Sequence, residues 1–117
     1  MKLREMAEKL CLNCLTPDLD LEAGPDVAGG HSSDLLSDVL ANAPAGGVLV
    51  TIQVHMNVIA VASHCELAAV IFAAGRLPDE ALRRKATEEG IALFSASRST
   101  FDVVGALYAE GLRGHVG

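Results

Sequence analysis

The chain has few aromatic residues, few cysteines and few positive charges, and each shortage limits what the protein can be. Its 117 residues contain no tryptophan, and the aromatic side chains are Phe72, Phe94, Phe101 and Tyr108. Because hydrophobic residues still make up 50% of the chain, the core must be mainly aliphatic. Nine basic and fifteen acidic residues give a formal net charge of −6, which argues against a general surface for nucleic acid or anionic membranes. Any site for an anion must therefore be local.

The first ten residues lack the apolar run of a secretory signal, because charged and apolar side chains alternate there at helical spacing. We therefore expect a cytoplasmic protein. The most hydrophobic region, residues 48–75, is interrupted by Gln53, His55, Asn57, His64 and Glu66. A strand, a helix and a second strand explain this region better than a membrane span.

Cysteine is represented by three residues, of which Cys11 and Cys14 form a C-x-x-C pair. This spacing occurs in redox and metal sites, but no second pair exists, and only Cys65 and scattered histidines remain to complete such a site. An iron–sulfur cluster bound by cysteines alone needs four of them. We therefore favour free, apolar thiols in a reducing compartment and predict neither a metal nor a cofactor. A redox or metal site is the alternative.

Catalytic signatures are also absent from the sequence. The chain has no phosphate loop of the G-x-x-x-x-G-K-[ST] type, no Gly-Lys dipeptide, no H-E-x-x-H and no G-x-S-x-G. An ATP-driven phosphotransferase would lack its usual lysine. We therefore predict that the protein is not an enzyme.

What the sequence does contain is a regular alternation of helical and extended patterns. We predict helices over residues 3–10, 33–42, 58–65, 79–89 and 101–112, strands over residues 25–28, 48–52, 68–73 and 91–94, and a short extended piece over 11–15. Pro78 and Asp79 mark one helix start, and Gly90 marks its end. In the last helix, the side chains predicted to face the core are Val103, Val104, Leu107 and Tyr108. The alternation predicts an α/β fold: one three-layer domain over residues 1–112, with a mostly parallel central sheet flanked by helices, and a flexible tail over 113–117.

The stretch from residue 26 to residue 38 predicts a strand, a tight turn and a helix. Gly29 and Gly30 would form the turn, where glycine allows a positive φ or a close backbone approach. One of Ser32, Ser33 and Asp34 would cap the helix, whose first amide groups then face whatever lies above the turn. The stretch is therefore a candidate anion or nucleotide site, although taken alone it is more simply a tight connection with nothing bound.

A ligand site is expected beyond the carboxyl ends of the parallel strands, near a topological switch point. From the segments that reach this edge we select as ligand-binding residues Gly29, Gly30, His31, Ser32, His55, Arg76 and Arg98. Together their guanidinium, imidazole and hydroxyl groups can bind a phosphate or a carboxylate. Structural alternatives exist, since Arg76 can pair with Asp79 or Glu80, the histidines can be structural, and the serines near residue 97 can be helix caps. For Asp34 and Asp38, one helical turn apart, a solvated helix face is favoured over a metal site.

The sequence Asp26-Val-Ala-Gly-Gly, followed by His-Ser-Ser-Asp-Leu-Leu-Ser-Asp, resembles the DRTGG domain, and residues 48–62, 75–80 and 90–94 fit stand-alone members of that family. The resemblance covers nearly the whole chain. Of the five letters that name the domain, Asp26, Gly29 and Gly30 match, whereas Val27 and Ala28 replace arginine and threonine. The resemblance implies an α/β fold similar to the non-catalytic amino-terminal domain of HPr kinase. It also implies a regulatory module of the kind found beside CBS domains in some pyrophosphatases, in some phosphotransacetylases, or as a small protein encoded near iron-only hydrogenases.

Residues and resemblance together predict a non-catalytic regulatory or ligand-sensing DRTGG module that binds a small anionic ligand, such as an adenine nucleotide, at the carboxyl edge of the sheet. A homodimer is expected from the family and from the large number of apolar side chains in a short chain. Two alternatives stay open. One is a redox or metal accessory protein of an iron-only hydrogenase, with Cys11 and Cys14 as the functional thiols and Cys65 as a further candidate, and the other is a purely structural protein-interaction domain. A hydrogenase-related protein is accordingly a candidate partner, whereas nucleic acid and membranes are not.

Overall fold

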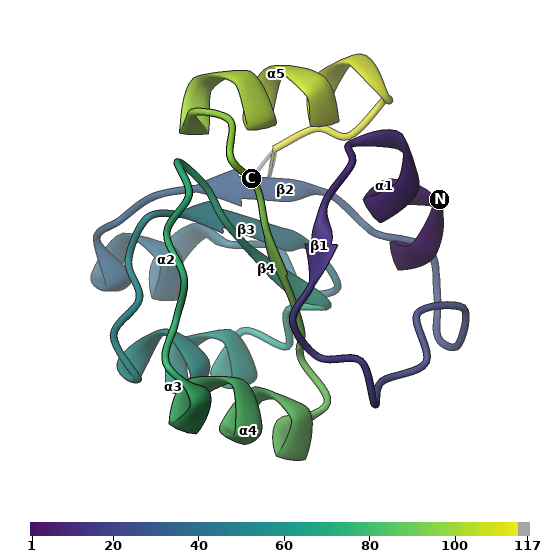
Figure 1. Cartoon of the computed structure of the whole chain (residues 1–117). Coiled ribbons are helices and arrows are strands. Elements are labelled where there is room, and N and C mark those ends of the chain that lie inside the picture. Colours follow the sequence, from purple (N-terminus) through teal and green to yellow (C-terminus); the bar gives the residue numbers. More distant parts are fainter. Residues whose placement is uncertain (115–117) are drawn as a thin grey trace.

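A five-stranded sheet separates the helices into two layers (Figure 1). This computed structural model describes residues 1–114, and residues 115–117 lie outside the described part. The helices are α1 (Leu3–Lys9), α2 (Leu36–Asn42), α3 (Asn57–His64), α4 (Glu80–Glu89) and α5 (Thr100–Ala109), and the strands are β1 (Asn13–Cys14), β2 (Gly30–Ser32), β3 (Val48–Thr51), β4 (Ala69–Phe72) and β5 (Ala92–Ser95). The predicted α/β architecture, with helices on both faces of a central sheet, is confirmed.

The strand order is β1-β5-β4-β3-β2. Strands β2 to β5 run parallel, and the short β1 pairs antiparallel with β5 at one edge. Because β2 to β5 are neighbours in chain order, their connecting helices α2, α3 and α4 cover one face, while α1 and α5 cover the other (Figure 1). At a topological switch point, the connections from two neighbouring parallel strands cross opposite faces of the sheet. The connections between β2, β3, β4 and β5 all cross the same face, so these four strands form no switch point.

Strands β3, β4 and β5 are buried on both faces, as their continuous apolar sequences predict. Successive residues alternate between the two sides, so that Val48 and Val50 pack with α1 and α5, whereas Leu49 packs with α2, α3 and α4. The core is mainly aliphatic as expected, with Phe94 on the first side and Phe72 on the second. The buried strands therefore fix the positions of the loops at the edges of the sheet.

The hydrophobic region over residues 48–75 forms β3, α3 and β4, in agreement with the predicted strand, helix and strand. None of the helices in residues 1–114 is both long enough and apolar enough to cross a membrane.

The start and end of α4 follow the predicted signals. Pro78 precedes the helix, and the Asp79 carboxylate accepts a hydrogen bond of 2.9 Å from the Leu82 N–H. Gly90 ends the helix with a φ of +74°, in the left-handed region that glycine adopts without strain. Both helix signals are therefore confirmed.

The strand predicted over residues 25–28 is wrong, because this segment lies outside the sheet and β2 begins at Gly30. The Val27 N–H donates to the Met1 carbonyl oxygen at 2.9 Å, and the Ala28 N–H donates to the Gly46 carbonyl oxygen at 3.0 Å. These backbone groups therefore bind the amino terminus and a loop instead of a neighbouring strand. As a result, Gly29 precedes a strand and Gly30 begins it, instead of both glycines following a strand.

Helix α5 ends at Ala109, before the predicted end at residue 112. Val103 and Leu107 are buried as predicted, but Val104 is 37% and Tyr108 58% exposed. The prediction is wrong for this second pair because their positions, about 100° further around the helix, place them on its flank. The predicted flexible tail begins at Arg113, whose carbonyl oxygen accepts a 3.0 Å hydrogen bond from the Gly30 N–H. Its last three residues lie outside the described part.

Candidate ligand site at the carboxyl edge of the sheet

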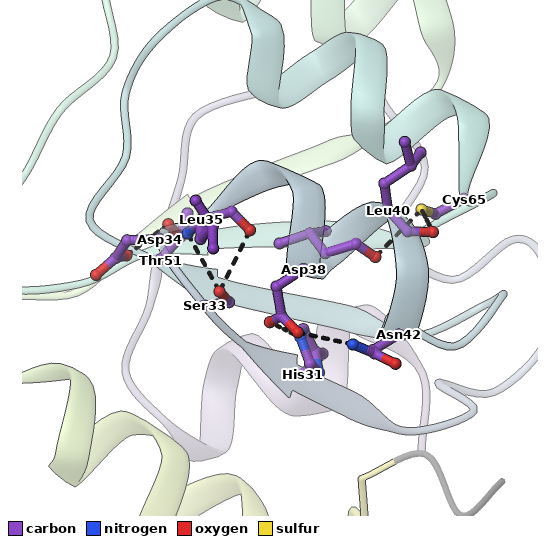
Figure 2. A network of polar contacts seen from close by, with 10 residues as sticks. His31, Ser33, Asp34, Leu35, Asp38, Leu40, Asn42, Thr51 and Cys65 are labelled. Carbon is purple, nitrogen blue, oxygen red and sulfur yellow. Dashed lines mark hydrogen bonds and ion pairs between the residues drawn. The ribbon is translucent and has the colours of Figure 1, made fainter.

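The Asp34 carboxylate joins the carboxyl ends of β2 and β3 (Figure 2). Its Oδ1 accepts one hydrogen bond from the Thr51 hydroxyl and one from the Ile52 N–H, each at 2.8 Å. Thr51 is fully buried, and its Oγ1 also accepts a 3.1 Å hydrogen bond from the Gln53 N–H. Asp34 was predicted to cap α2 or share a solvated helix face with Asp38. It instead fixes the loop that leads from β3 to α3.

His31 lies in the middle of β2 and bonds to α2 (Figure 2). Its Nε2 is 2.8 Å from Asp38 Oδ2, and Asp38 Oδ1 accepts a hydrogen bond of 2.7 Å from the Asn42 amide. The His31 contact, followed by the Asn42 and Ser33 contacts, lowers the pKa of the Asp38 carboxyl below its ordinary value of 3.8. With its side chain 19% exposed, His31 supports the structural alternative weighed above.

The loops after β3, β4 and β5 are fastened together by backbone hydrogen bonds. The Ala73 N–H donates to the Thr51 carbonyl oxygen at 3.0 Å, the Ala74 N–H to the Arg98 carbonyl oxygen at 2.7 Å, and the Gly75 N–H to the Ala96 carbonyl oxygen at 2.9 Å. Ala74 and Gly75 adopt positive φ angles of 57° and 70° to make this junction. Arg76 and Arg98 therefore lie on adjoining loops at the same edge.

Both arginines are exposed, and neither forms an ion pair within residues 1–114. The predicted alternative in which Arg76 pairs with Asp79 or Glu80 is not observed there, because the Glu80 carboxylate binds Arg84 at 3.0 Å. The whole chain has a net charge of −6, whereas these two neighbouring loops carry guanidinium groups, which are the kind of side chain that binds phosphates and carboxylates.

Side-chain acceptors lie at or just before the starts of the helices at this edge, although the N-cap residues of α2 and α3 form no side-chain cap hydrogen bond. The Leu35 N–H donates to Ser33 Oγ at 3.1 Å, the Asn57 N–H to His55 Nδ1 at 3.1 Å, and the Asp102 N–H to Ser99 Oγ at 3.2 Å. Ser99 is therefore a helix cap, as the structural alternative for the serines predicted. His55 also accepts a hydrogen bond from the first residue of a helix, α3. At the start of α5 one amide group is therefore already bound by a side chain of the chain itself.

The two glycines chosen from the sequence lie at the opposite, amino edge of the sheet. Gly30 pairs with Val48, the first residue of β3, and a Cβ on Gly29 would come within 2.8 Å of the Arg113 carbonyl oxygen. Two roles were predicted for these glycines, a positive φ and a close approach of the backbone. Gly29 has the second role, and neither glycine has a positive φ. The structure places Ser32, His55, Arg76 and Arg98 at the carboxyl edge and separates Gly29 and Gly30 from them. Of the seven residues predicted to bind a ligand, four therefore lie at the carboxyl edge, His31 lies in the middle of β2, and the two glycines lie at the amino edge.

The three thiols do not gather at one place. Cys11 and Cys14 are exposed next to α1 and in β1, whereas Cys65 is partly buried at the end of α3, on the other face of the sheet. The Cys65 thiol lies 3.6 Å from the Val39 carbonyl oxygen, and burial raises its pKa. Within residues 1–114 no group of three or more histidine, cysteine or carboxylate side chains is placed to hold a metal ion.

A pocket of about 230 Å³ between β2 and α5 was not predicted. Its lining includes Ser32, Val104, Leu107 and Tyr108, and the Arg113 guanidinium lies 3.7 Å from the centre of the Tyr108 ring. The sequence does carry a signal for it, because apolar residues at positions 101, 104 and 108 form a second helical stripe beside the buried one.

The fold and the edge loops together define an α/β domain in which Arg76 and Arg98 lie on adjoining loops at the carboxyl edge of the sheet. No family model matches the chain, and no curated protein matches it. A solved structure is similar in fold: the CBS and DRTGG domains of the regulatory region of Clostridium perfringens pyrophosphatase, complexed with the activator diadenosine tetraphosphate. The TM-score is 0.73 at 11% sequence identity, over 91% of this chain and 45% of that chain. The likeness concerns the fold and agrees with the DRTGG-like architecture expected from the sequence, while the hydrogenase link stays a prediction.

Proposed function

We propose that the protein is a non-catalytic regulatory module that senses a small anionic ligand, such as an adenine nucleotide, at the carboxyl edge of its sheet. The observation that carries this proposal is the similarity in fold to a regulatory region that was solved with a nucleotide activator. This chain corresponds to less than half of that region, so the sensing role is proposed here for the single α/β domain.

Arg76 and Arg98 are the ligand-binding residues in this proposal. Their loops are joined by the hydrogen bond between the Ala74 N–H and the Arg98 carbonyl oxygen, and in this proposal both guanidinium groups bind the same phosphate chain. Arginine is suited to this task because its planar fork binds phosphate oxygens in pairs. His55, on the loop after β3, and Ser32, at the end of β2, lie at the same edge and are available for further polar contacts.

The non-catalytic part of the proposal is supported by the hydrogen bonds of the two histidines at or near the site. His31 Nε2 binds the Asp38 carboxylate, and His55 Nδ1 accepts from a helix amide. Within residues 1–114 neither ring bonds to a serine hydroxyl or a cysteine thiol, the arrangement that activates a nucleophile. Binding, rather than covalent chemistry, is what the arginine pair is equipped for.

The test is a thermal-shift panel of AMP, ADP, ATP, diadenosine tetraphosphate, other phosphorylated metabolites and inorganic phosphate, with hits followed by titration calorimetry. A ligand at about 100 times its dissociation constant adds about 2.7 kcal/mol to the free energy of unfolding. The double variant Arg76→Ala/Arg98→Ala should lose this shift. The matched control Arg4→Ala/Arg84→Ala removes the same charge from two arginines that pair with Glu22 and Glu80 elsewhere, and it should retain the shift.

A flat response across the panel, or equal losses in both double variants, would contradict the sensor site. The purely structural interaction domain would then be the better description. The second candidate, a redox or metal accessory protein, is favoured by one observation, the exposure of Cys11, which follows α1, and of Cys14, which lies in β1. It requires bound iron or zinc in freshly purified protein, or a C-x-x-C dithiol that cycles with a physiological reductant.

A further inference from the structure

The pocket between β2 and α5 lies beside an edge strand of the sheet, at a place where that strand lacks a side chain. The His31 side chain bonds to α2 on the other face, so Gly30 and Ser32, its neighbours in β2, face α5. A Cβ added to Gly30 would meet only the Val48 carbonyl oxygen within 4 Å, at the ordinary contact distance of 3.7 Å. Glycine weakens a strand, and it is typical of a position that a ligand or another backbone approaches closely.

The walls of the pocket are mainly apolar, with Val50, Val104, Leu107, Tyr108 and Leu112 among them. Val104 is 37% and Tyr108 58% exposed, because both border this hollow instead of packing against β2. A cavity of about 150 Å³ is enough to hold a benzene molecule. The volume of about 230 Å³ therefore accommodates a phenyl ring or a branched alkyl group.

Arg113 forms part of the same wall, and its position is fixed by several contacts. Its Nη1 donates to the Tyr108 carbonyl oxygen at 2.9 Å and to the Leu112 carbonyl oxygen at 3.0 Å, and the guanidinium lies 3.7 Å from the centre of the Tyr108 ring. The Arg113 carbonyl oxygen accepts from the Gly30 N–H at 3.0 Å, at the close approach that Gly29 permits. The pocket is therefore largely formed before any ligand binds, as is usual for small-molecule sites.

The charges of the lining indicate an anion as the polar part of the ligand. No acidic residue lines this pocket, whereas three other pockets within residues 1–114 each have at least one carboxylate residue in their walls. The N–H groups on Nε and Nη2 of Arg113 have no acceptor in that part of the chain. A carboxylate can therefore bind there without meeting a like charge, and it matches the planar fork of the guanidinium.

We propose that this pocket binds a small carboxylic acid with a compact apolar body, of the arylacetic or branched aliphatic class. The apolar body lies between Gly30 and α5, and the carboxylate binds Arg113. Scaled from the six non-hydrogen atoms of benzene in about 150 Å³, the pocket holds about nine such atoms, which excludes a whole nucleotide. Neither Arg76 nor Arg98 lines it, so this site is separate from the proposed sensor site and does not depend on it.

The test uses two matched pairs of probes, phenylacetate with phenylacetamide and 4-methylpentanoate with 4-methylpentanamide, which differ in charge and hardly in shape. Binding to the full chain is followed by two-dimensional NMR, in which the amide signals of Gly30 and Ser32 should shift. Fluorescence serves as a second readout for the aliphatic pair, because Tyr108 is the only tyrosine and the chain has no tryptophan. The acids should bind with a dissociation constant at or below about 1 mM, as is ordinary for ligands of this size, and about tenfold more tightly than the amides.

Gly30→Val fills the pocket from the side of β2. Its Cβ makes an ordinary contact and valine favours a strand, so the melting temperature should not fall, while binding of the acids and of the amides should be lost. Arg113→Met should weaken the acids about tenfold, to the level of the amides, and leave the amides unchanged. The matched control Arg4→Met removes an arginine that pairs with Glu22, and it should change neither.

The double variant Arg76→Ala/Arg98→Ala should bind the acids as the wild type does, which separates this proposal from the sensor site. Equal affinities for acid and amide, acids that do not saturate the chain at about 10 mM, or acid binding that Gly30→Val leaves intact would overturn the proposal. Loss of acid binding in the double variant would also overturn it, because the acids would then bind at the carboxyl edge.

Discussion

Asp34→Ala should destabilise the domain by about 1.5–3 kcal/mol. The substitution leaves the Thr51 hydroxyl and the Ile52 N–H without their acceptor, and both hydrogen bonds to the carboxylate are 2.8 Å long. Thr51 is fully buried, so its unsatisfied hydroxyl should cost about 1–2 kcal/mol. Water can reach the partly exposed Ile52 N–H, which lowers that share to about 0.5–1 kcal/mol. The sum is a large part of the stability of an ordinary domain.

Urea denaturation provides the assay, with the free energy of unfolding compared at an unchanged dependence on urea. Asp34→Asn keeps a carbonyl oxygen in the same place and should lose only about 0.5–1 kcal/mol, the charged part of the two bonds. In a Thr51→Val background, Asp34→Ala should cost less than in the wild type, with a coupling energy of at least about 0.5 kcal/mol. A loss below about 0.5 kcal/mol for Asp34→Ala would refute the bridging role of the carboxylate.

Gly29→Ala should destabilise the domain by about 1–3 kcal/mol in the same assay, because its Cβ would lie 2.8 Å from a backbone carbonyl oxygen; a neutral effect would disprove the close approach. The lowered pKa of Asp38 means that its stabilising effect is fully present above the unfolded pKa, near 3.8, and is lost as the pH falls through the folded pKa. Melting temperatures measured from about pH 5 to pH 2 should therefore fall less steeply for Asp38→Asn than for the wild type, and parallel curves would contradict this. Because burial raises the pKa of Cys65, a thiol reagent should modify the exposed Cys11 and Cys14 quickly and Cys65 slowly, and three equal rates would contradict the packing of Cys65.

The alternation of strands and helices could be predicted because β3, β4 and β5 are each continuous apolar runs between recognisable punctuation. Pro78, Asp79 and Gly90 mark α4 by local chemistry alone, since a cap and a left-handed residue act within one turn. The adjoining positions of Arg76 and Arg98 also followed from a general rule, that parallel strands end at one edge of their sheet.

Strand β2 could not be predicted from its own residues. Gly30, His31 and Ser32 contain no apolar side chain, and the strand forms because it pairs with residues 48–50 of β3. Such pairing is a tertiary effect that local periodicity does not report. The apolar residue Val27 lies just before β2, and the strand was therefore predicted over residues 25–28. That prediction placed Gly29 at the carboxyl edge of the sheet instead of the amino edge. The Asp34 bridge was missed for the same reason, because its partner Thr51 is distant in the chain.

The amino terminus and Arg113 are both held by the short segment over residues 26–30. The Met1 amine is 3.3 Å from Asp26 Oδ2, and the Met1 carbonyl oxygen accepts from the Val27 N–H, while the Arg113 carbonyl oxygen accepts from the Gly30 N–H. Three residues of extended chain span about 10 Å, so the polypeptide enters and leaves the domain through nearly the same place. A domain built in this way can be inserted into a surface loop of another protein, or circularly permuted with a short linker, without separating the flanking ends.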